Sequence, residues 1–308
     1  MRELPVVPLL DRVEDATSLD AAVAGLSRVA GALLRPRALR DLLHGVPAGH
    51  PLHPVAVLVP VGGWLGAAVL DAVPGNARAA RTLVGVGILG ALPSVASGLT
   101  DWSELHRRQQ RTGLVHAVGN AAALALYSAS YVQRRRGRQV SGALLGWAGL
   151  GVVGAASFVG GHLSYRQAAG ANHAEHVPHR FPAGWQVAGS VDAVTEGELS
   201  RLEVQGTSLV ALRRGDRVDV LSNVGSHLGA PLSEGELVLD GNEARVRDPW
   251  RGSEYSFATG RVVHGPATAP QPRLETRVVD GRLEVRLPGA DGEVPRTDGH
   301  RASAAARG

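Results

Sequence analysis

The chain has 308 residues, its 32 basic side chains are all arginine, it carries 28 acidic ones, and it contains no cysteine. The missing cysteine excludes thiol catalysis, disulfides and any metal site built from thiolates alone. The arginine excess lies beside the apolar first half, whereas residues 184–288 carry 12 Arg against 15 acidic side chains, so the charge pattern argues against a nucleic-acid-binding protein.

Residues 1–44 form the first predicted unit. The apolar side chains Leu19, Val23, Leu26, Val29 and Leu33 fall at helical spacing, which predicts an amphipathic helix lying on a membrane surface. Four acidic side chains among the first fifteen residues, without a basic start and an apolar run, argue against a cleaved signal peptide.

Residues 45–166 contain four apolar segments, each long enough to cross a bilayer. These segments are Val55–Val73, Thr82–Thr100, Leu114–Val132 and Val140–Leu163. They contain no Arg or Glu and share a single acidic residue, Asp71. Helices of a water-soluble bundle would need polar faces that these segments lack. The sequence therefore predicts an all-α, four-helix transmembrane domain.

Polar side chains gather at one end of these expected spans. Threading the chain through four spans places on the same side the residues His50, His53, Asp101, His116 and His162. Histidine is costly in a bilayer, so converging imidazoles suggest a haem or metal site, a proton relay or a quinone site. The alternative is that they are interfacial residues, hydrogen-bonded to headgroups, water or backbone.

Three motifs occur in order within this half: GHPLHP at 49–54, GLTDW at 98–102 and GGHLSYR at 160–166. Over residues 35–170 the chain resembles a family of bacterial four-helix membrane proteins of unknown function. The resemblance implies a multi-pass protein of the bacterial cell membrane. Arginines flank both ends of the expected spans almost equally, so the positive-inside rule selects no orientation. Without a signal peptide, we expect the soluble part to be cytoplasmic.

A linker is predicted at 167–183, followed by short alternating runs over residues 184–288 separated by turn dipeptides such as Asp-Gly. This pattern predicts an all-β domain of six to nine strands in small antiparallel sheets. Residues 289–308 are rich in Gly, Ala, Arg and Asp and are predicted to be a disordered tail.

The stretches NVGSHLGAPLSEGEL (223–237) and DPWRGSEYSF (248–257) resemble a Rieske ferredoxin domain, from about Trp185 to Leu287. In that family a Cys-x-His loop and a Cys-x-x-His loop hold a 2Fe-2S cluster through two thiolates and two imidazoles. Carried over by this resemblance, the four ligand positions hold Gly225, His227, Asp248 and Arg251. The supporting loop keeps Pro249, Trp250, Ser253 and Tyr255.

Only His227 among the four positions is a ligand of the family's type. Glycine has no donor side chain, arginine stays protonated, and one carboxylate suits an iron–sulfur centre poorly, so we expect no cofactor in this domain. In its place, Asp248 could pair with Arg251 while His227 hydrogen-bonds the carboxylate. A mononuclear metal on His227 and Asp248 is the other possibility, but it lacks a third ligand.

The sequence thus favours an integral membrane protein with a degenerate Rieske-like domain in a non-redox binding or structural role. The alternative is a membrane-bound electron-transfer protein, either of the Rieske iron–sulfur type or using haem or quinone at the membrane histidines. No catalytic constellation can be identified. The expected partners are the lipid bilayer and a redox or membrane protein.

Overall fold

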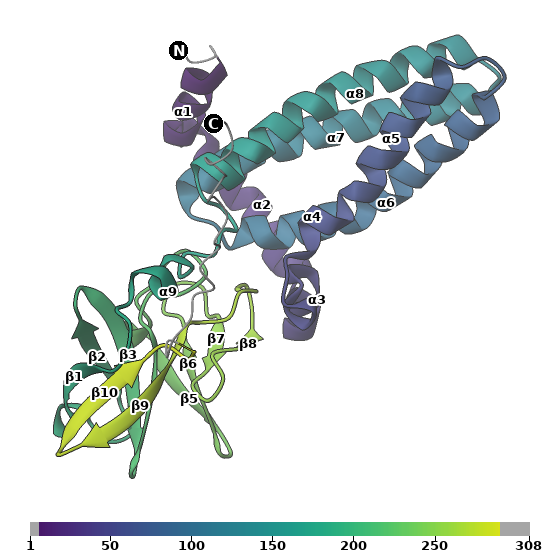
Figure 1. The fold of residues 1–308 in the computed structure, drawn as a ribbon. Coiled ribbons are helices and arrows are strands. Elements are labelled where there is room, and N and C mark those ends of the chain that lie inside the picture. Colours follow the sequence, from purple (N-terminus) through teal and green to yellow (C-terminus); the bar gives the residue numbers. More distant parts are fainter. Residues whose placement is uncertain (1–5, 290–308) are drawn as a thin grey trace, which may run out of the picture.

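The computed structural model describes residues 6–289, in which a helical region and a β domain lie end to end (Figure 1). Three short helices come first: α1 (Val6–Asp15), α2 (Asp20–Leu33) and α3 (Arg37–His44). The long helical part consists of α4 (Leu52–Ala56), α5 (Leu58–Asp71), α6 (Ala77–Ser103), α7 (Arg107–Arg135) and α8 (Gln139–Gly161). A π-helical turn (His162–Arg166) and the short α9 (His176–Arg180) lead to the β domain.

Helices α5 to α8 form a bundle in which α5 packs against α6 and α8, and α7 packs against α6 and α8. Its centre holds Trp64 stacked on Tyr127, with ring centroids 4.1 Å apart. Glycines make room for these rings, since a Cβ at Gly87 would lie 2.2 Å from the Trp64 indole nitrogen. Such close approach through small residues is typical of helices that pack in lipid.

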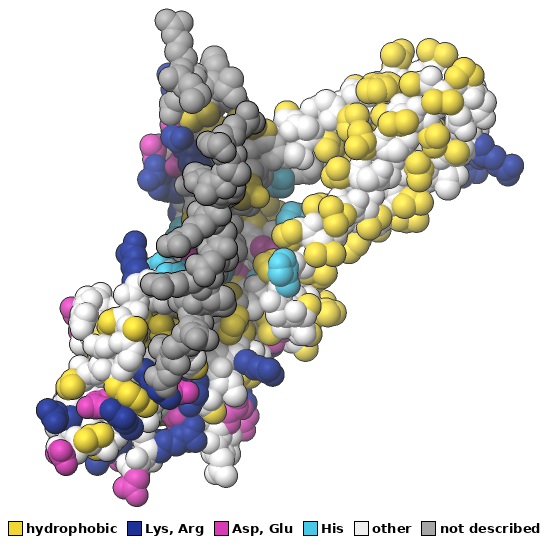
Figure 2. All heavy atoms as spheres, in the orientation of Figure 1, with side chains coloured by type: hydrophobic (Ala, Val, Ile, Leu, Met, Phe, Trp, Pro, Cys, Tyr) yellow, Lys and Arg dark blue, Asp and Glu magenta, His cyan; other side chains and the backbone are white. Residues whose placement is uncertain are grey.

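All four expected apolar segments are helical, but among residues 6–289 only three helices are long and apolar enough to cross a membrane. These are Leu52–Asp71, Ala77–Ser103 and Gln139–Arg166. Helix α7 is as long as the others, yet His116, Asn120 and its Ser and Tyr residues lower its hydropathy. Three of the four expected spans therefore have the apolar character of a membrane span, and α7 completes the same bundle. Figure 2 shows hydrophobic side chains over much of the bundle surface.

An ion pair closes the bundle between α5 and α7. Both guanidinium Nη atoms of Arg134 donate to the Asp71 carboxylate at 2.6 Å, and Arg134 Nε donates to Ser130 Oγ at 3.1 Å. The side chains are only 1% and 7% exposed, so neither charge is solvated by bulk water. Asp71, the only acidic residue of the expected spans, thus has a buried partner that the sequence did not identify.

The N-terminal helices pack on the outside of this bundle. Helix α1 contacts α7, α2 contacts α6 and α7, and α3 contacts α4 and α6. Of the apolar stripe expected on α2, Val23 is buried, whereas Val29 and Leu33 are exposed. Arg111 of α7 binds both carboxylate oxygens of Asp20 at 2.9 Å. One part of the apolar stripe therefore packs against the bundle, and the other part is exposed. The location of residues 1–44 on a membrane surface stays a prediction.

The β domain contains ten strands rather than the six to nine expected, because its short paired segments β7 and β8 are separate strands. One sheet has the order β1-β10-β9-β4-β3-β2 and the other β5-β6-β7-β8, with all neighbours antiparallel. The strands are β1 (Gln186–Ser190), β2 (Leu199–Val204), β3 (Thr207–Arg214), β4 (Arg217–Ser222), β5 (Glu236–Asp240), β6 (Glu243–Arg247), β7 (Glu254–Ser256), β8 (Val262–His264), β9 (Arg273–Val279) and β10 (Arg282–Arg286). The expected all-β architecture is confirmed. The predicted tail lies almost wholly outside the described residues.

Candidate functional site

Two loops at the helix-facing end of the β domain carry the four sequence-predicted ligand positions. The first loop follows β4 and is closed by the Gly225 amide donating to Ala230 O at 2.8 Å. The second follows β6 and is closed by the Asp248 amide donating to Ser253 O at 2.8 Å. The loops are tied together by Ser226 Oγ, which lies 3.0 Å from the Tyr255 hydroxyl. The fold therefore brings the two predicted loops side by side.

The supporting residues have distinct surroundings. Ser253 Oγ accepts a hydrogen bond from the Ala267 amide at 3.0 Å. Burial raises the pKa of Tyr255 to about 12, so its hydroxyl stays protonated as a hydrogen-bonding group. Pro249 is exposed, and Trp250 lies edge-on to His106 of the helical region, with ring centroids 5.6 Å apart. Ser253 and Tyr255 therefore stabilise the loops, whereas Trp250 contacts the helical region.

The expected pairing of Asp248 with Arg251 is wrong. Asp248 Oδ1 instead accepts the backbone amides of Trp250 at 2.6 Å and Arg251 at 2.9 Å, closing its own turn. Burial raises the pKa of Asp248, although these two amides act in the opposite direction. The longer Arg251 side chain reaches across to the helical region and donates through Nη2 to Leu105 O at 2.7 Å. The Asp248 carboxylate therefore accepts hydrogen bonds from the backbone amides of its own turn and not from the Arg251 side chain.

His227 does not bond the Asp248 carboxylate either. Its ring donates a hydrogen bond to the backbone carbonyl of Glu104, and burial lowers the pKa of the imidazole to about 4. Three buried polar atoms at the positions carried over from the Rieske family have no partner within residues 6–289: His227 Nε2, Asp248 Oδ2 and Arg251 Nε. Among the described residues these loops provide no set of three His or acidic side chains at metal-binding spacing.

The loops and the adjoining strands dock on α3 and on the connection between α6 and α7. Arg37 Nη2 donates to Glu254 Oε1 at 2.7 Å, although the two residues are 217 positions apart. Asp41 accepts from His264 Nδ1 at 2.8 Å and from the Gly265 amide at 2.9 Å. Figure 1 shows α3 next to β8 at this junction. No sequence pattern predicts these contacts, because nothing in the sequence relates α3 to the second loop.

The membrane-side histidines make separate, local hydrogen bonds. His53 Nδ1 is 2.9 Å from Ser94 O, and His116 Nδ1 is 2.8 Å from Ala156 O. His50 is exposed and lies 3.3 Å from Pro51 O. Asp101 binds the buried His44, at 2.7 Å between Oδ1 and Nδ1. Within the described chain, no three members of the predicted cluster come together at metal-binding spacing.

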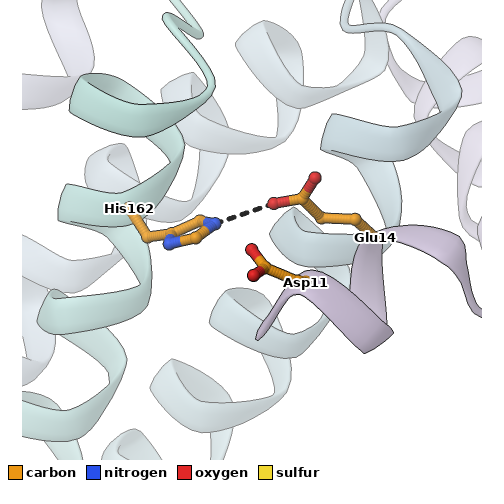
Figure 3. Close-up of side chains that lie close together, drawn as sticks. All are labelled: Asp11, Glu14 and His162. Atoms are coloured by element: carbon orange, nitrogen blue, oxygen red, sulfur yellow. Dashed lines mark hydrogen bonds and ion pairs between the residues drawn. The ribbon is translucent and has the colours of Figure 1, made fainter. Parts of the chain in front are cut away.

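His162 belongs instead to a group with Asp11 and Glu14 of α1 (Figure 3), in which the possible ligand atoms lie within 4.8 Å of one another. His162 Nε2 is 2.8 Å from Glu14 Oε1. Arg108 lies 3.4 Å from Glu14, and Arg166 lies 3.4 Å from Asp11. Burial raises the pKa of Glu14, but hydrogen bonds from His162 and Gln167 outweigh it and lower the value. With two guanidinium groups on the carboxylates, this group is a charge-balanced contact that fastens α1 to the end of α8.

Comparison with known proteins agrees with this division. Residues 49–173 match the family described as predicted membrane protein (DUF2231), and residues 184–279 match the Rieske [2Fe-2S] domain. The anthranilate 1,2-dioxygenase ferredoxin subunit of Burkholderia cepacia is 31% identical over 105 residues, which cover 34% of this chain and 94% of that protein.

Solved structures similar to the β domain include the carbazole 1,9a-dioxygenase ferredoxin of Nocardioides aromaticivorans IC177, 22% identical, covering 33% of this chain and 97% of that one, with a TM-score of 0.31. A putative NADH-dependent nitrite reductase small subunit from Mycobacterium tuberculosis is 24% identical, covering 34% and 96%, also with a TM-score of 0.31. The chain therefore joins a membrane domain of the DUF2231 family to a domain that belongs to the Rieske [2Fe-2S] family.

Proposed function

We propose that this protein is a multi-pass bacterial membrane protein whose Rieske domain works without a cluster, as a non-redox binding and structural module. The donor chemistry carries this proposal. The family's cluster requires two thiolates, and the chain has no cysteine, so the residues present do not fit the cofactor. Gly225, Asp248 and Arg251 supply no replacement, since glycine has no donor side chain, Arg251 stays protonated and Asp248 accepts the amides of its own turn.

The proposed role of the loops is to hold the soluble domain against the membrane domain. The face that presents the cluster ligands in the family here contacts α3 and residues 104–106, so an external partner would meet other surfaces of the domain. The similarity to a dioxygenase ferredoxin subunit favours electron transfer as the second candidate, with a redox protein as partner. That role would require iron ligands from outside this chain. We place the soluble domain on the cytoplasmic side.

Purified in detergent, the full chain is expected to contain no iron or acid-labile sulfide and to show no visible absorption band. A positive control is the triple variant Gly225→Cys, Asp248→Cys, Arg251→His, which restores the family's ligand types at all four positions. The added Cβ at residue 225 would lie 3.1 Å from Ala230 O, so it requires only a small shift. Two irons and two sulfides in the unmodified protein would refute the cluster-free proposal, and a Soret band would assign haem to the membrane histidines.

Docking can be measured separately, because a cysteine-free chain accepts spin labels only where cysteines are introduced. With labels at Ala38→Cys on α3 and Ala258→Cys in the β domain, the unmodified background should give one narrow distance distribution. Asp41→Ala removes two hydrogen bonds to the β domain, with an expected loss of about 2–3 kcal/mol and a broadened distribution. Asp216→Ala, in an exposed turn, is the matched control. Identical distributions for both substitutions would contradict a docked arrangement.

A further inference from the structure

A polar pocket of about 240 Å³ lies between the two domains, lined by α3, Glu104 and the second loop of the β domain. Four of its lining residues are arginines: Arg37, Arg40, Arg247 and Arg251. Two of these four, Arg40 and Arg251, form no ion pair within residues 6–289.

The arginines divide into two kinds. Arg37 and Arg247 share the buried carboxylate of Glu254, at 2.7 and 2.9 Å. The side chain of Arg40 forms no hydrogen bond or ion pair with any residue in the described range, and the Arg251 side chain binds only a backbone carbonyl, leaving its buried Nε without a partner. Both of these guanidinium groups, which lack an ion-pair partner among the described residues, border the same pocket.

The acidic residues of the pocket do not neutralise these groups. Asp41 has one oxygen on His264 and the other on the Gly265 amide. Glu104 lines the pocket but lies beyond ion-pair distance of every described arginine. Arg37 and Arg247 are paired with Glu254, and Arg247 also with Glu236, whereas the side chains of Arg40 and Arg251 form no ion pair among the described residues. Guanidinium groups without a carboxylate partner can donate two parallel hydrogen bonds to the oxygens of a phosphate group.

The pocket lies beside the start of the first apolar span. On α3, Arg37, Arg40 and Asp41 face the pocket, while Leu42 on the opposite side is 56% exposed, and α3 packs against α4 at the start of the first apolar span. A second hollow of about 390 Å³ shares Arg40 and Glu104 with the first, and its other lining residues are Ser27, Ala30, Gly31, Leu34, Arg35 and Ser103. A polar pocket that continues into a hollow of mixed polarity beside exposed leucines matches a molecule with a charged head, a polar glycerol region and a hydrocarbon body.

We propose that this junction binds the phosphate group of a membrane phospholipid, with Arg40 and Arg251 as its ligands and the α2 hollow receiving the glycerol end of the acyl chains. The site goes beyond a purely structural role for the Rieske domain, because the lipid would bridge the two domains. It rests on the docked arrangement proposed above, which the iron analysis and the spin-label distances test without any lipid.

The test uses the full chain in detergent, titrated with dioleoylphosphatidylglycerol, with dioleoylglycerol, which lacks the phosphate, and with inorganic phosphate. Binding is followed by native mass spectrometry and by the shift in melting temperature. Arg40→Gln should weaken phosphatidylglycerol binding about tenfold, since it removes charge-assisted hydrogen bonds while breaking no contact within the described protein. Arg28→Gln, an exposed arginine of α2 away from the pocket, should bind as the unmodified protein does.

Equal affinity of the Arg40→Gln and unmodified proteins would overturn the proposal, as would equal binding of dioleoylglycerol and phosphatidylglycerol. Saturation by inorganic phosphate with no gain from the acyl chains would assign the pocket to a soluble phosphate compound and overturn the lipid assignment. Because Arg40 has no part in docking, its substitution should leave the spin-label distance unchanged. A loss of lipid binding with an unchanged spin-label distance can therefore be told apart from a failure of docking.

Discussion

Replacing Asp71 by alanine is expected to destabilise the helical bundle by about 3–5 kcal/mol, the largest effect of any single substitution proposed for this protein. The substitution leaves the Arg134 guanidinium buried without its counter-ion, at a position where the side chain is 1% exposed. Ser130 Oγ would remain as one acceptor but carries no charge. Unfolding by sodium dodecyl sulfate, followed by tryptophan fluorescence, measures the loss.

Two variants separate the charge from the packing. Asp71→Leu combined with Arg134→Met removes both charges, and it should recover most of the stability, because burying an ion pair costs desolvation that an apolar pair avoids. Glu284→Ala breaks the more exposed pair with Arg277 and should cost below about 1 kcal/mol. If Asp71→Ala cost no more than Glu284→Ala, the bundle would not depend on the Asp71–Arg134 contact.

Lowering the pH from 7 to 4 is expected to weaken the docked state by up to about 3 kcal/mol through His227 alone. Burial lowers the pKa of this imidazole from 6.5 to about 4. The hydrogen bond to the Glu104 backbone acts in the opposite direction, and the nearby His44, His173 and Arg251 lower the pKa further. Because the folded value lies below the ordinary one, the neutral ring's contribution is complete above about pH 6.5. It is lost progressively as the pH falls towards 4, where protonation favours release of the ring into water.

The melting temperature and the spin-label distance, each measured at several pH values, report this linkage. His227→Gln keeps a side chain able to hydrogen-bond the Glu104 backbone but cannot be protonated, so it should flatten the pH profile. Burial also lowers the pKa of His106, so a smaller dependence of the same sign should persist in the variant. His179→Gln, on an exposed residue, is the control. An unchanged slope in His227→Gln would show that this ring is not buried at the interface.

Sequence patterns sufficed for the parts of this protein that depend on local composition. Apolar length without charge predicted the helices from Leu52 to Leu163, and period-two alternation with Asp-Gly turns predicted the β domain. The spacing of the two loops carried the Rieske resemblance, which the family match confirmed. The absence of cysteine, a property of composition alone, was enough to rule out the family's thiolate ligands.

The tertiary structure decided which charges meet. Asp248 and Arg251 are three positions apart and of opposite sign, yet the carboxylate takes the amides of its own turn and the guanidinium crosses to Leu105. Asp71 and Arg134 are separated by 63 residues and meet bidentately. A local pattern fixes which segments are helices or strands, because it reflects periodic burial. The partner of a long polar side chain depends on the packing of distant segments, which puts α3 and the second loop around one pocket.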